Sequence, residues 1–146
     1  MVLIHHAGVR NTIKHRVEAL RPDSQRKWGR MTVDQMLWHV NRSLAESVGE
    51  YSGPPSKPPI PRRLLRWLAL NVPWPRGART RPDLVAAQHY DFELEKLRCL
   101  AFIDRVAHRD LNAVWPRSAG FGDMTGTHWS RLQAKHLDHH LKQFGV

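Results

Sequence analysis

The sequence is poor in several features that would otherwise define its class. Cys99 is the only cysteine, which excludes an intramolecular disulfide and a cysteine-based metal site. No apolar run approaches the roughly 18 residues that a membrane span requires, and the N-terminus has too few apolar residues for a signal peptide. We therefore expect a cytoplasmic protein without a transmembrane segment. The length of 146 residues predicts a single domain spanning residues 1–146.

Acidic residues are missing between Glu50 and Asp83. That stretch instead holds seven basic residues: Lys57, Arg62, Arg63, Arg66, Arg76, Arg79 and Arg81. It therefore carries +7 of the formal net charge of +10. Two interpretations stay open, an anion-binding surface and an arginine-rich connector exposed to water. The second is favoured, because charge runs of this kind are usually solvated.

Alternating apolar and polar residues, the pattern of a half-buried strand, persist nowhere in the chain. Apolar residues instead recur at helical spacing. Four long helices are predicted. The first carries the apolar stripe Val9, Ile13, Val17 and Leu20. The others run from Thr32 to Gly49, from Asp91 to about Ala107, and from Thr125 to about Phe144. Prolines interrupt residues 51–82, where only 62–71 could form a short helix. The pattern predicts an all-α four-helix bundle with a long proline-rich connector between the second and third long helices.

Two of the predicted helices begin alike. Gly29-Arg30-Met31-Thr32 precedes the second and Gly122-Asp123-Met124-Thr125 precedes the last. Each threonine is a favourable N-cap, and Gln35 completes a capping box with Thr32. Both helices that follow carry tryptophan and histidine, so the two starts provide a common origin for comparing their faces.

Histidine is abundant, with ten in the chain, and His136, His139 and His140 lie close together in the last predicted helix. His136 and His140 are four residues apart, which places them on one helix face at a spacing that suits a single metal ion. Random placement of the histidines would give about 0.7 such pairs, so the spacing alone is a weak signal. Both residues also fall in the apolar arc of the helix. A pair of hydrogen-bonded core histidines is the alternative interpretation.

A third ligand has to come from another helix, and His39 is the only histidine of the second one. Counted from the two N-cap threonines, His39, His136 and His140 lie seven, eleven and fifteen residues in, so that their helix faces correspond. His39 nevertheless lies at the flank of the apolar stripe of its own helix. Three neutral histidines are the ligand set of an open zinc site; nickel and iron(II) are the other candidates.

Several motifs of the chain resemble one family. They are Trp28-Gly29-Arg30-Met31-Thr32 with Gln35, Met36 and His39; Pro75-Arg76-Gly77 to Pro82; Asp91-Phe92-Glu93; Phe121-Gly122, Thr125 and Trp129; and the stretch from Lys135 to Gly145. In these residues the chain resembles the DinB superfamily, most closely a branch of short bacterial proteins of unknown function. The similarity covers most of the chain from about Arg10, and the C-terminal stretch is its most specific part.

The resemblance implies a four-helix bundle of up-down-down-up type with a three-histidine metal site. His39, His136 and His140 occupy the ligand positions, and Gln143 matches a glutamine that often follows the second histidine of the pair. Members of the superfamily are often homodimers. Some relatives are metal-dependent enzymes that use low-molecular-weight thiols in transfer, isomerisation or detoxification, whereas others have no known activity.

Three hypotheses follow. The first is a divalent-metal enzyme, a transferase or hydrolase, in which Asp138, His139 and Gln143 orient the ligands or move protons and arginines of segment 57–81 hold a small anionic thiol. For His139, a surface position is favoured over a catalytic one. The second is a non-catalytic, metal-stabilised stress or regulatory protein. The third, a nucleic-acid or membrane-surface binder, ranks last because no nucleic-acid-binding signature is present.

Overall fold

The computed structural model describes residues 1–146, which form five α-helices and one 3-10 turn without a β-strand. These elements are α1 (Ala7–Glu18), α2 (Val33–Ser47), α3 (Arg62–Asn71), η1 (Pro82–Leu84), α4 (Phe92–His108) and α5 (Gly126–Gln143). The all-α prediction is confirmed, as are the four long helices and the short helix inside the proline-rich segment. None of the helices combines the length and apolarity that crossing a membrane would need.

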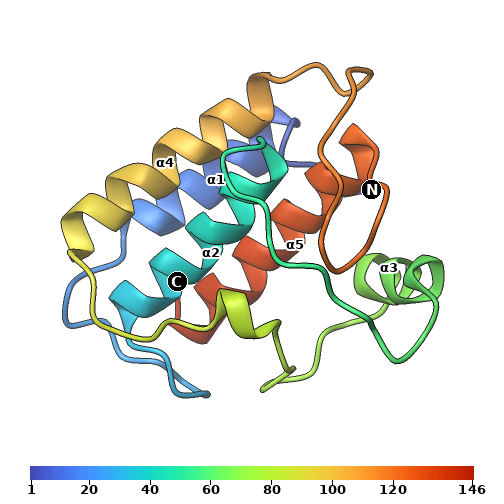
Figure 1. Cartoon of the computed structure of the whole chain (residues 1–146). Coiled ribbons are helices and arrows are strands. Elements are labelled where there is room, and N and C mark those ends of the chain that lie inside the picture. Colours follow the sequence, from blue (N-terminus) through green and yellow to red (C-terminus); the bar gives the residue numbers. More distant parts are fainter.

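The four long helices lie side by side, and α3 stands at one edge of them (Figure 1). Helices α1 and α5 run in one direction, whereas α2 and α4 run in the other. Helix α2 packs against α4 and α5, α1 packs against the same two helices, and α3 contacts α5. Because α2 and α4 are parallel, the chain between them has to return along the whole bundle. Residues 48–91, which include α3 and η1, make this crossover.

Local hydrogen bonds fix the helix ends where the sequence predicts them. The Gln35 side-chain oxygen accepts the N–H of Thr32 at 3.1 Å, which is the contact a capping box supplies before α2. Helix α4 starts with the Asp91 carboxylate accepting the N–H of Leu94 at 2.9 Å. At α5 the Thr125 hydroxyl accepts the N–H of His128 at 3.1 Å. The register of each helix, and therefore the face its histidines share, is set at these points.

A single apolar core fills the space between the four long helices. Its fully buried side chains include Met36 and Leu37 from α2, Ile103 from α4, and Trp129 and Leu137 from α5. Cys99 is also fully buried, and burial raises its pKa to about 12, so it stays a protonated thiol. This core holds α2 and α5 at a fixed separation, which is the separation that the candidate site uses.

The proline-rich segment is not merely a solvated connector. Arg81 has an ion pair with Glu46 of α2 at 3.0 Å and another with Asp83 at 2.8 Å, and all three side chains are largely buried. The hydroxyl of Tyr51 donates to the same Asp83 carboxylate at 2.9 Å. Arg66 and Arg81 are partly buried, whereas the expectation of exposed basic residues holds for the other five, Lys57, Arg62, Arg63, Arg76 and Arg79. The ion pairs fasten η1 against the bundle beside α2.

Candidate metal centre

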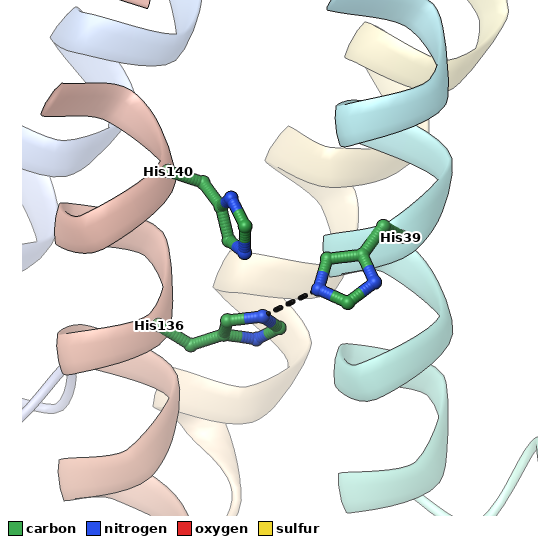
Figure 2. Close-up of side chains that lie close together, drawn as sticks. All are labelled: His39, His136 and His140. Carbon is green, nitrogen blue, oxygen red and sulfur yellow. Dashed lines mark hydrogen bonds between the residues drawn. The ribbon is translucent and has the colours of Figure 1, made fainter. Parts of the chain in front are cut away.

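The structure brings together the three histidines that the sequence singles out. His39 of α2 faces His136 and His140 of α5 across the interface between the two helices (Figure 2). Only 3%, 7% and 8% of these residues is exposed, respectively. One ring nitrogen from each lies within 4.8 Å of the others, and the Nε2 atoms of His39 and His136 are 2.9 Å apart. No other group of three or more His, Cys, Asp or Glu side chains comes together in this way.

The two halves of the cluster are positioned differently. His136 and His140 lie one turn apart on the buried face of α5, as their spacing predicts. His39 is predicted at the flank of α2, but it is buried because η1 covers that flank. The carbonyl of Leu84, the last residue of η1, lies 2.7 Å from His39 Nδ1. The crossover segment therefore supplies the cover that the pattern of α2 alone does not show.

Hydrogen bonds determine which nitrogens of His39 and His140 are free. A carbonyl oxygen can only accept, so the contact to Leu84 requires the proton of His39 to sit on Nδ1. His140 Nδ1 donates in the same way to the side-chain oxygen of Gln143 at 2.7 Å. The amide nitrogen of Gln143 donates to the carbonyl of Trp28 at 2.9 Å, which fixes the orientation of the amide. Both histidines therefore present an Nε2 lone pair.

His136 completes the set. Its Nε2 lies 2.9 Å from Nε2 of His39, which carries a lone pair and no proton. Two lone pairs at this distance repel each other unless a positive charge lies between them. Either His136 donates a proton from Nε2, or a cation takes the place of that proton. The donor chemistry of the cluster therefore fits a divalent metal ion held by nitrogen ligands.

Burial keeps all three rings in the form that binds metal. Burial lowers the pKa of His39 and lowers that of His136 well below 6.5, and the neighbouring imidazoles add to the effect at His136. Burial likewise lowers the pKa of His140 to about 3. Each neutral imidazole offers one ring-nitrogen lone pair to a metal, and His136 offers it at Nε2 when its single ring proton lies on Nδ1. Tetrahedral zinc with Zn–N bonds of about 2.0–2.1 Å needs nitrogens about 3.3 Å apart, so small ring movements suffice.

The residues predicted to support the ligands differ in where they lie. Gln143 contacts the cluster directly through His140. His139 is half-buried, with its ring centroid 5.1 Å from that of His140. Asp138 instead pairs with Arg16 at 2.8 Å and with Lys142 at 2.7 Å. Of the three candidates, Gln143 alone makes a hydrogen bond to one of the clustered histidines.

Two groups that support the clustered histidines could not be predicted from the sequence. The Leu84 carbonyl belongs to the backbone, so no residue type marks it. Gly29 has φ +81°, and a Cβ added there would meet the Gln143 amide nitrogen at 2.6 Å. A side chain at position 29 would displace the glutamine that orients His140. The signal for Gly29 is its place in the motif before α2, but the motif alone does not reveal its role.

A cavity of about 540 Å³ borders the cluster. All three histidines and His139 line it, together with apolar side chains of the crossover and α5 that include Leu68, Trp74 and Leu132. Trp74 lies 5.7 Å from His136 between ring centroids. The cavity, which we call the histidine cavity, offers a small molecule an apolar space next to nitrogen lone pairs.

Neither a protein-family model nor a curated protein nor a solved structure matches this chain. The geometry of the histidine cluster and of the histidine cavity is therefore the basis for any statement about function.

Proposed function

We propose that the protein binds one divalent metal ion, with zinc as the first candidate, through Nε2 of His39, His136 and His140. The observation that carries the proposal is the convergence of the three buried rings, two of them held with Nε2 lone pairs inward by hydrogen bonds at Nδ1. Nickel and iron(II) suit imidazole as well. Three protein ligands leave a tetrahedral ion one further position for a small molecule.

The histidine cavity supports an enzyme over a metal site with a purely structural role. A structural zinc site is filled by four protein ligands, whereas only three ligating side chains gather here and a cavity borders them. When bound, a divalent ion acts as a Lewis acid and lowers the pKa of a water or thiol that it coordinates. The reaction class we propose is transfer or detoxification with a small thiol as cosubstrate.

Several residues around the histidine cluster have a defined part in this proposal. The carbonyl of Leu84 and the amide of Gln143 hold the rings of His39 and His140 in place. Apolar side chains such as Leu68 and Leu132 restrict water in the histidine cavity. Arg79 lines that cavity and is exposed, unlike the ion-paired Arg81, so it is the connector arginine placed to hold an anionic thiol.

We further propose that the chain is a divergent member of the DinB superfamily. Three features agree with what the resemblance implies. Helices α1 and α5 run opposite to α2 and α4, and a long crossover joins α2 to α4 (Figure 1). The candidate ligands come from α2 and α5. The homodimer that the resemblance implies stays a prediction.

Elemental analysis of purified, zinc-loaded protein tests the metal proposal. We expect one metal ion per chain in the parent and none in His136→Ala. His15→Ala is the matched control, because His15 lies in α1 with its side chain 89% exposed. It should keep the parental stoichiometry. A metal-free parent after loading, or a His136→Ala variant that retains its ion, contradicts the proposal.

Activity separates the enzyme from the non-catalytic alternative. Metal-loaded protein is incubated with common cellular thiols and an electrophile, and thiol consumption is followed. An enzyme loses this activity on chelation. A metal-stabilised protein instead shows only a lower melting temperature when the ion is removed.

A further inference from the structure

A second cavity, of about 590 Å³, lies next to the histidine cavity. The side chains of Trp74 and His139 line both cavities and so form a shared wall. Unlike its neighbour, this cavity is lined by several lysine and arginine side chains. We call it the basic pocket, and the residues of its lining that matter here are Lys27, Trp28, Trp74, Arg76, Lys135, Asp138 and Lys142.

Positive charge dominates the basic pocket. Four of its side chains are lysine or arginine, whereas Asp138 is its only acidic side chain. Asp138 pairs with Lys142 of the pocket at 2.7 Å and with Arg16, which does not line the pocket, at 2.8 Å. Two cations share this one carboxylate, so positive charge remains in excess around the pocket. Four cations that converge around one hollow attract a counter-ion, because their mutual repulsion is relieved when an anion enters.

Hydrogen-bond donors of the basic pocket remain available. Arg76 lies over the ring of Trp28, with the guanidinium carbon 4.6 Å from the ring centroid. Stacking of this kind leaves the N–H groups at the edge of the guanidinium free for another partner. The Lys135 ammonium donates to the carbonyls of Ala69 and Val72, which leaves one of its three donors. Neither Arg76 nor Lys27 pairs with a carboxylate of the chain.

We infer that the basic pocket binds a small organic anion that carries phosphate or carboxylate groups. Arg76 presents the planar set of donors that suits either group, and Lys27 and Lys142 supply point charges beside it. The tryptophan side chains give the pocket rigid walls. The inference depends on this pocket alone and does not require a metal in the histidine cluster.

The test uses inorganic pyrophosphate as the probe, because it offers two linked phosphate groups and no apolar part. It is titrated into the His136→Ala variant freed of metal, so that chelation by pyrophosphate plays no role. Binding is followed by calorimetry and by the NMR signals of the tryptophan indole N–H groups. We expect saturable binding that weakens as salt is added, with shifts at Trp28 and Trp74 but not at the fully buried Trp129.

Two further variants locate the site. In the same background, Arg76→Gln should weaken pyrophosphate binding about tenfold, the effect of losing one charge-assisted hydrogen bond. Arg63→Gln removes the same charge from an exposed position of α3 outside the basic pocket and should change binding far less. Absence of saturable binding, or equal weakening by both variants, would overturn the inference. Intact pyrophosphate binding by a variant that no longer binds metal would support the inference.

Discussion

The interface between α2 and α5 contains two neighbouring polar layers with different chemistry. In one layer the Gln133 amide nitrogen donates to the carbonyl and the hydroxyl of Ser43, both at 3.1 Å. In the other, one turn nearer the N-terminus of α2, His39 meets His136 and His140. Both layers are buried. In the Ser43–Gln133 layer the buried donors have buried acceptors, whereas in the histidine layer nitrogen lone pairs face one another.

The difference shows that burial of polar residues is not by itself the mark of a site. A buried donor that finds a buried acceptor stabilises the fold and needs nothing from outside. Nitrogen lone pairs that face one another need a proton or a metal ion to make their burial favourable. The Ser43–Gln133 layer therefore serves as an internal control for every prediction about the histidine layer.

The largest effect is expected when one ligand is removed. His140→Ala should weaken zinc binding more than about 100-fold, because even changes to groups behind the ligands cost 10–100-fold. Gln133→Ala should leave zinc affinity unchanged while it lowers the free energy of unfolding by about 1–3 kcal/mol, since Ser43 loses its buried partner. Competition with a chelating indicator and urea unfolding measure the two quantities. Equal zinc affinities in the two variants would remove the distinction between the layers.

The next effect concerns Gln143. Gln143→Leu removes the acceptor for His140 Nδ1–H and should weaken zinc binding about 10–100-fold. Gln143→Glu keeps an acceptor in place and should bind zinc more tightly than the leucine variant. The same competition assay measures the zinc affinity of both variants. A leucine variant with parental affinity would mean that the ring of His140 is held by packing alone.

Acid should destabilise the metal-free protein through the histidine layer. The pKa of His140 is about 3 in the folded protein against 6.5 for an ordinary histidine, because burial disfavours the charged ring. The unfolded chain therefore binds more protons below pH 6.5, so stability is full above that pH and falls as the pH approaches 3. Each histidine that protonates only on unfolding costs about 1.4 kcal/mol per pH unit.

Urea unfolding of metal-free protein at pH 7 and pH 5 measures this loss. We expect a smaller pH dependence in His140→Leu than in the parent, while Gln133→Ala keeps the parental dependence because amides do not titrate. Identical dependence in all three proteins would show that other groups, such as carboxylates, cause the acid sensitivity.

The smallest effect is expected at Asp138. Its ion pairs with Arg16 and Lys142 are partly exposed, with 40% of the Asp138 side chain accessible. Asp138→Asn should therefore lower the free energy of unfolding by less than about 1 kcal/mol and leave zinc affinity unchanged. A marked fall in zinc affinity would show that this carboxylate acts on the histidine layer after all.

Much of the histidine layer can be predicted from the sequence. The spacing of His136 and His140 and the apolar arc of α5 place both rings at a buried face, and the structure agrees. His39 is the one histidine that α2 offers. Helix geometry also explains why Asp138 turns away: at about 100° per residue it lies about 200° around the helix from His136.

The rest could not be predicted, because it depends on the crossover. Proline removes the periodicity from which packing is deduced, so the pattern gives no sign that η1 covers His39. Arg81 pairs with Glu46, a residue 35 positions earlier, and nothing local to either side chain indicates the other. The buried environment of His39 follows from these long-range contacts.

X-ray absorption at the zinc edge of the loaded parent protein reports the number and the kind of the ligands around the ion. We expect imidazole nitrogens from three histidines at about 2.0–2.1 Å from the ion, with one of them lost in His39→Ala. A spectrum that fits two or fewer imidazoles in the parent, or that is unchanged in His39→Ala, would contradict a site shared by α2 and α5.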